Sequence, residues 1–126
     1  MEGKILIFEV TDPALLEKIR LAMGLCQVEV RVVERGKYHQ SIGVLAGIPG
    51  GKLSGSGMEM PLPEPMMVLC LPQSRLDGVL AALRGIGVPP MAKAMLTPTN
   101  AGWLPAQLLA ELRRERAEFA KMGVRN

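Results

Sequence analysis

The stretch KILIFEVTDPALLEKIRLAMGLCQVEVRVV, residues 4–33, contains a strand, a helix and a second strand in succession. Its opening KILIFEV is mostly apolar, as in a buried strand. Asp12 followed by Pro13 is typical of a helix start, because aspartate caps free N–H groups and proline suits the first helical position. Apolar residues then recur at helical spacing, and Gly24 is expected as the left-handed residue after the helix. The final VEVRVV alternates apolar and charged residues, so residues 4–33 are predicted to form a β-α-β unit with one solvated sheet face.

A second β-α-β unit is predicted at residues 66–97. It opens with the apolar run MMVLCL. Ser74 is expected to cap its helix, with Asp77 three residues later as a capping-box acid. Gly87 is expected to end this helix, and residues 92–96 form the fourth strand.

The two units are joined by residues 34–64, a connection rich in glycine and proline in which only residues 41–46 are expected to form a short helical turn. An amphipathic helix opened by Pro105 follows at residues 105–122. We therefore expect residues 1–126 to form a single α/β domain, an α+β sandwich of the ferredoxin-like βαββαβ type with an extra C-terminal helix. A small open parallel α/β sheet is the alternative.

The charged second strand favours the sandwich, because it predicts a sheet with one exposed face. The glycine-rich loop, the last helix or a second subunit would cover that face. Aromatic residues make up only 3% of the chain, so an aliphatic core is expected.

The composition limits the classes of protein to which this chain can belong. The chain has 126 residues, 48% hydrophobic and 21% charged, with a net charge of +3. It contains no apolar run of the roughly 20 residues that a membrane span needs. It shows no signal peptide, and two free thiols, Cys26 and Cys70, suit a cytoplasmic protein.

Several classes of site are not expected. The basic residues of the last helix alternate with glutamates, and aromatic residues stand among basic ones only at Tyr38 and His39, so nucleic acid is not an expected partner. Two cysteines and one histidine make no metal set, and we expect neither metal nor cofactor. The glycines around Gly51-Lys52 and Gly55-Ser56-Gly57 fit neither the P-loop nor the dinucleotide pattern.

His39 is the one candidate for a general base, since its ordinary pKa suits proton transfer near neutral pH. Ser41 and Glu34 are near it only in sequence. We therefore interpret His39 as an exposed loop residue, and an enzyme that uses it is our third hypothesis.

The fourth strand and the turn after it carry a further candidate cluster, on the side where β-α-β units usually bind ligands. Its members are Lys93, Thr97, Thr99, Asn100 and Trp103. The structural alternative is that Asn100 and Thr99 bond locally to the backbone and shape the entry to the last helix. Trp103 would then hold that helix to the sheet.

Leu96-Thr97-Pro98-Thr99-Asn100, with Trp103 three residues later, resembles the signature of an uncharacterised bacterial family common in Firmicutes, described as a domain of unknown function. The segment 40–50 resembles the linker motif QxxGxLxGxxG of that family. The chain departs from the pattern at Leu104-Pro105, where a Thr or Ser cap is expected, and at residues 51–60, which are less acidic. The resemblance implies a small cytoplasmic protein without an established activity. It makes these residues the candidate ligand site: Gln40, Gly43, Gly47, Lys93, Thr97, Thr99, Asn100 and Trp103.

These observations give a first hypothesis of a non-enzymatic binding or regulatory module, self-associating as a homodimer through the sheet face or the last helix. The alternative is a domain that binds a small anionic ligand between the Gln40–Gly50 loop and the Thr97–Asn100 turn.

Overall fold

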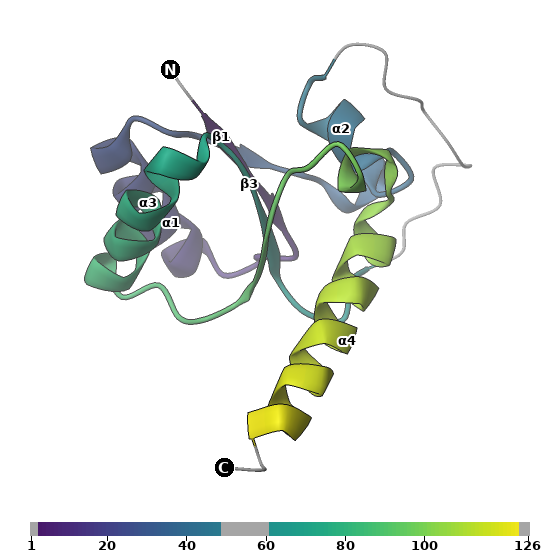
Figure 1. The fold of residues 1–126 in the computed structure, drawn as a ribbon. Helices are drawn as coiled ribbons and strands as arrows, with labels where there is room; N and C mark the ends of the chain where they lie inside the picture. The colour runs from purple at the N-terminus through teal and green to yellow at the C-terminus, as the bar shows by residue number, and fades with distance from the viewer. Residues whose placement is uncertain (1–2, 49–60, 124–126) are drawn as a thin grey trace.

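The computed structural model describes residues 3–48 and 61–123. Gly50 and the glycines of residues 51–57 lie outside these ranges. The chain forms a mixed sheet with helices on both faces (Figure 1). Its elements are β1 (Lys4–Phe8), α1 (Pro13–Cys26), β2 (Glu29–Val32), the 3-10 turn η1 (Arg35–Lys37), α2 (Ile42–Leu45), β3 (Met66–Cys70), α3 (Gln73–Ile86), β4 (Ala92–Met95), the 3-10 turn η2 (Asn100–Gly102) and α4 (Pro105–Gly123).

The strand order is β2-β1-β3-β4. β1 pairs in parallel with β2, and β3 in parallel with β4, while β1 and β3 pair antiparallel at the centre. The α+β architecture is confirmed. The ferredoxin-like order is wrong, because there a strand of the other unit separates the two strands of each β-α-β unit. The all-parallel alternative is also wrong, because each unit returns to an adjacent strand and the two units meet antiparallel.

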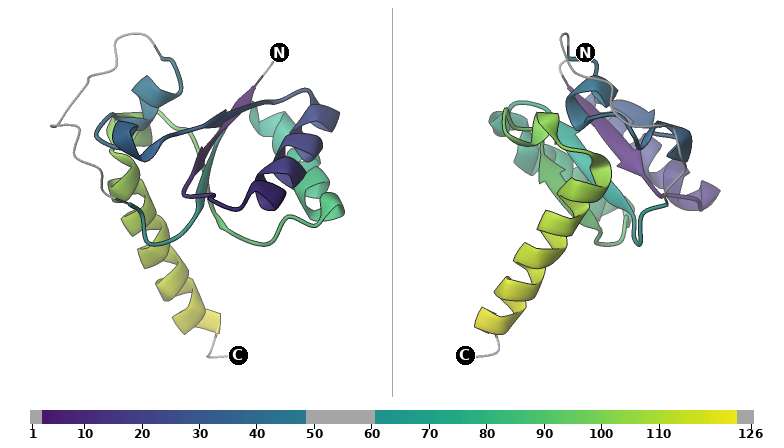
Figure 2. Two further views of the ribbon diagram at one scale, coloured as in Figure 1. Left: turned by 180° about the vertical axis from the view of Figure 1, so that it is seen from behind. Right: turned by 90° about the vertical axis from the view of Figure 1, so that its right-hand side faces the viewer.

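Both faces of the sheet are buried. On β1, Ile5 and Ile7 face the layer of α1 and α3, and Leu6 and Phe8 face the layer that includes α2 and α4. All four side chains are fully buried. The left panel of Figure 2 shows the two layers on opposite sides of the sheet. The last helix was one of three segments expected to cover a face of the sheet. Together with α2 it covers the second face.

The start of α1 is as predicted, because the Asp12 Oδ1 atom accepts a hydrogen bond from the N–H of Ala14 at 3.0 Å. The predicted end at Gly24 is wrong. The helix continues to Cys26, and Gln27 takes the left-handed conformation, with φ of 58°. The backbone N–H of Gln27 bonds to carbonyls of the last turn. Because the backbone makes this cap, the glutamine side chain gives no sequence signal of the helix end.

The start of α3 also differs from the prediction. The helix begins at Gln73, after Pro72 in extended conformation, and no side chain caps it. Ser74 is therefore already helical and cannot act as the cap, so the capping box with Asp77 is absent. The predicted end is confirmed, since Gly87 is left-handed with φ of 92°.

α4 begins at Pro105, as predicted, and ends at Gly123. Leu108 and Leu109 are buried against the sheet, whereas all side chains from Arg113 to Lys121 are exposed. The second half of the helix projects away from the sheet (Figure 2). Within the described ranges, no helix combines the length and apolarity that crossing a membrane requires.

Candidate functional site

Two segments that the sequence singled out, the one that begins at Gln40 and the one from Thr97 to Trp103, meet in space. The N–H of Ile42, at the start of α2, donates a hydrogen bond to the carbonyl of Trp103 at 2.9 Å. A Cβ atom at Gly43 would lie 3.0 Å from the carbonyl oxygen of Ala101. Only glycine allows this approach, so Gly43 lets α2 rest directly against η2.

The Thr97–Asn100 turn is closed by reciprocal hydrogen bonds. The Asn100 Oδ1 atom accepts from the N–H of Thr97 at 2.9 Å, and the Thr97 Oγ1 atom accepts from the N–H of Asn100 at 3.0 Å. The Asn100 Nδ2 atom donates to the carbonyl of Met95, at the end of β4, at 2.9 Å. Asn100 is only 7% exposed, so its side chain shapes the chain locally. The local bond expected of Thr99 is made by Thr97, and Thr99 is exposed.

Trp103 lies where η2 leads into α4. Its side chain is half-buried and packs on the buried cluster that contains Ile42 and Leu109. This contact is the one expected of a residue that holds the last helix to the sheet.

A pocket of about 310 Å³ lies on the other side of α2, between this helix and the edge strand β2. Its lining residues are Arg31, Val32, Val33, Lys37, Gln40, Val44 and Leu45. Gln40 is the only predicted site residue among them. Arg31 and Lys37 were missed, because in the sequence they are ordinary exposed positions of a strand and a turn.

Two cations close the C-terminal end of α2. The Arg31 Nη1 atom donates to the carbonyl of Leu45 at 3.0 Å, and the Lys4 Nζ atom donates to that of Ala46 at 2.8 Å. Arg31 also pairs with Glu29 at 2.9 Å. Gly47 follows with φ of 84°, a conformation that favours glycine, beside these two side chains. The guanidinium of Arg31 is therefore held in place at the pocket wall.

Lys93 is separated from this region. It pairs with Met67, which belongs to the α1 and α3 layer, whereas its neighbours Ala92 and Ala94 pack on the layer of α2 and α4. Its Nζ atom donates to the carbonyl of Met91 at 3.3 Å. Burial, with a smaller effect of Arg84, lowers the pKa of this lysine. The structure therefore does not bring Lys93 to the other predicted site residues.

A buried carboxylate follows β1. Glu9 has a left-handed backbone with φ of 62°, and its side chain is only 7% exposed. Its oxygens accept hydrogen bonds from Arg35 at 3.0 and 2.8 Å, and its N–H donates to the Tyr38 hydroxyl at 3.0 Å. The hydrogen bonds from Arg35 are the main cause that lowers the pKa of Glu9. Burial, followed by the charge of Glu9, raises the pKa of Tyr38 to about 12.

Sequence reasoning missed Glu9, because nothing in KILIFEV distinguishes it from a solvent-facing strand residue. His39, next to Tyr38, is half-buried rather than exposed, and its Nδ1 atom is buried. In the described part of the chain, His, Cys, Asp and Glu side chains form no group of three that could hold a metal ion.

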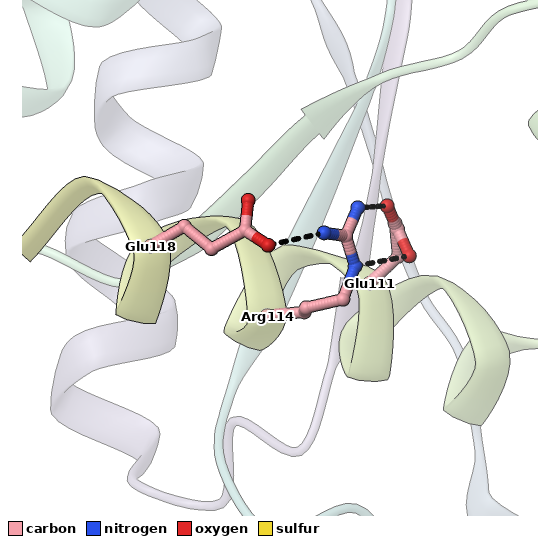
Figure 3. Close-up of polar contacts among 3 residues, drawn as sticks. All are labelled: Glu111, Arg114 and Glu118. Carbon is pink, nitrogen blue, oxygen red and sulfur yellow. Dashed lines mark hydrogen bonds and ion pairs between the residues drawn. The ribbon is translucent and has the colours of Figure 1, made fainter. Parts of the chain in front are cut away.

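The charges of α4 pair with nearby charges. Arg114 lies between Glu111 and Glu118 on the outer side of the helix, and its Nη1 atom is 2.8 Å from Glu118 (Figure 3). Arg116 and Arg113 pair with Glu64 at 2.7 and 3.3 Å. Hydrogen bonds from Arg114 and Arg116 lower the pKa values of Glu111 and Glu64, respectively. Three arginines of this helix thus have carboxylate partners, and the pairs of Arg114 with Glu111 and Glu118 are those that the alternating charges predicted.

A family described as a domain of unknown function (DUF3783) matches residues 65–119. These residues extend from the start of β3 into α4 and include the Thr97–Asn100 turn and Trp103. The match covers less than half of the chain, and the family description assigns no activity. No curated protein and no solved structure matches the chain. Over residues 65–119 the chain is therefore similar to a family of unknown function.

Proposed function

We propose that the protein is a small non-enzymatic binding module whose ligand is a small anion held in the pocket between α2 and β2. The observation that carries this proposal is the composition of the pocket wall. Arg31, Lys37 and Gln40 supply two cations and an amide, and apolar side chains supply the rest. Such a combination of apolar walls and a few placed polar groups is typical of ligand pockets.

The donor groups of the pocket wall that remain unused support the proposal of an anionic ligand. Among the described residues, the side chains of Lys37 and Gln40 have no hydrogen-bond or ion-pair partner. Arg31 is fixed by Leu45 and Glu29 and keeps further N–H groups for a ligand. Charged hydrogen bonds to phosphate or carboxylate are about twice as strong as neutral ones.

This pocket differs from the position that the sequence suggested. The side-chain oxygens of Thr97 and Asn100 already accept hydrogen bonds from each other's backbone, and Asn100 also donates to Met95. We therefore place the ligand on the Gln40 side of α2 and assign the Thr97–Asn100 turn a supporting role. From the resemblance of segments 40–50 and 96–103, we also propose a bacterial, cytoplasmic protein.

The test is a ¹H–¹⁵N NMR titration of the protein, first with inorganic phosphate and then with small carboxylates. We expect shifts of the backbone signals at residues 31–45. Lys37→Ala and Gln40→Ala should each weaken binding about tenfold, as expected for the loss of one charged or buried hydrogen bond. Lys121→Ala, an exposed cation on the projecting part of α4, is the matched control. Shifts confined to other regions, or binding that Lys37→Ala leaves unchanged, would refute the proposal.

A further inference from the structure

We infer that a second copy of this chain docks on the outer surface of α1 and α3. Leu21 and Leu25 lie one turn apart on α1 and are 58% and 70% exposed. Of the large apolar side chains exposed in the described ranges, only these two share an element. Together they form an apolar ridge on α1, which we call the leucine ridge.

α3 has small residues where α1 has the ridge. Both helices are 14 residues long, and the positions that correspond to Leu21 and Leu25 are Ala81 and Gly85. Gly78 lies one turn before Ala81 on the same exposed side. A Cβ atom added at Gly78 or Gly85 would have no neighbour within 4 Å. These three positions therefore present only small residues beside the leucine ridge, and we call this stretch of α3 the groove.

The leucines of the ridge and the small residues of the groove lie at matching positions along the axes of the two helices. α1 and α3 run antiparallel side by side (Figure 1). The Arg75 guanidinium donates to the carbonyl of Cys26, and the Cys26 Sγ atom lies 4.0 Å from the carbonyl of Gly78. Counting along the two helices from these contacts places Leu25 at the level of Gly78 and Leu21 at that of Ala81.

Consider a two-fold axis on the outer surface, parallel to the two helices and midway between them. Rotation about this axis leaves the position of every residue along the helix direction unchanged. It places α1 of one copy over α3 of the other, so the leucine ridge enters the groove of small residues. By symmetry the same contact forms twice, as in other isologous dimers.

The charges on the flank of this surface favour the same arrangement. Glu17 lies nine residues before Cys26, and Arg84 lies nine residues after Arg75. Nine residues are about two and a half turns, so both side chains lie at one level and on the flanks away from the neighbouring helix. Within residues 3–48 and 61–123, neither has an ion-pair partner. The two-fold axis brings Glu17 of each copy beside Arg84 of its partner, and this charge match identifies a second copy as the occupant.

Sedimentation equilibrium of the full chain, over about a hundredfold range of concentration, tests the inference. We expect a dimer whose dissociation constant rises about 100-fold or more in Leu21→Glu, because each dimer loses the contact twice. Gly85→Leu should weaken the dimer from the other side by filling the groove, and its open surroundings leave the monomer fold intact. Phe119→Glu changes an exposed apolar side chain on α4 and should leave the dimer unchanged.

Charge reversal tests the orientation. Glu17→Arg and Arg84→Glu should each weaken the dimer, and the double variant should restore it. Three results would overturn the inference: a monomer at every concentration, a dimer lost in Phe119→Glu but kept in Leu21→Glu, or a double charge variant weaker than either single one.

Discussion

Asn100 connects β4, the following turn and η2 through one side chain, and we predict that it contributes to stability more than any exposed residue of its motif. Asn100→Ala removes the bonds to Thr97 and Met95 and leaves two part-buried backbone groups without this side-chain partner. Each unsatisfied group costs about 1–3 kcal/mol, so the free energy of unfolding should fall by about 2–4 kcal/mol. Urea denaturation measures this change.

The matched control is Thr99→Ala, at an exposed position of the same turn whose side chain caps no helix. Its effect should stay within about 0.5 kcal/mol. Asn100→Asp keeps the acceptor for Thr97 but loses the donor to Met95, so an intermediate loss is expected. Equal stability of the Asn100 and Thr99 variants would show that the turn does not depend on this amide.

Glu9 combines a left-handed backbone with a buried carboxylate, and its charge should make stability depend on pH. Its pKa in the folded protein lies below the ordinary value of 4.5. The carboxylate therefore contributes stability that is fully present above about pH 4.5 and is lost as the pH falls through the folded-state pKa. At pH 7 we expect Glu9→Gln to lower the free energy of unfolding by about 1–3 kcal/mol.

Unfolding curves of the two proteins between pH 7 and pH 2 check the sign. The difference between them should shrink as the pH falls. Glu34→Gln, at an exposed position before η1, is the control and should change the free energy of unfolding at pH 7 by no more than about 0.5 kcal/mol. A difference that stays constant or grows in acid would contradict the assignment of the effect to the Glu9 charge.

α2 is a single short helix, and its position depends on close contact with η2. Gly43→Ala places a methyl group 3.0 Å from the carbonyl oxygen of Ala101 and 3.3 Å from its Cβ atom. Because the atom it meets is backbone, α2 and η2 must separate, and we expect a loss of about 1–3 kcal/mol. Gly36→Ala, in η1 with nothing within 4 Å, should be nearly neutral. Thermal unfolding of the two variants compares them directly, and equal melting temperatures would count against this contact.

The ends of the helices and strands show which structural features could be predicted from the sequence. Asp12 and Gly87 act through their own chemistry, a side-chain acceptor and a freely accessible left-handed backbone, so both were predicted correctly. Gln27 and Glu9 adopt left-handed conformations without glycine. The N–H of Gln27 bonds to the last turn of α1, and Glu9 bonds to Arg35 and Tyr38. A pattern of residue types does not contain those contacts. For the same reason the pocket cations Arg31 and Lys37 were missed.

For the whole molecule, the sequence predicted two β-α-β units and the last helix, but not how the units join. The order of strands depends on the antiparallel pairing of β1 with β3, which brings together residues about sixty positions apart. Both strands are apolar on both faces, so no alternation distinguishes a centre from an edge. By contrast, the hypothesis of a ligand site between the loop that begins at Gln40 and the Thr97–Asn100 turn already placed these two segments together, and the hydrogen bond from Ile42 to Trp103 joins them.

The central strands β1 and β3 belong to both layers of the core, and we therefore predict that the two layers unfold together. Ile7 faces α1 and α3, whereas Trp103, the only tryptophan, packs in the layer of α2 and α4. Tryptophan fluorescence thus reports on one layer, and far-UV circular dichroism reports on the whole fold. Ile7→Val should lower the free energy of unfolding by about 0.5–1.5 kcal/mol. If the layers are coupled through β1, the urea midpoint from Trp103 fluorescence must shift as far as the midpoint from circular dichroism. A fluorescence midpoint that Ile7→Val leaves in place would show that the layer of α2 and α4 unfolds independently.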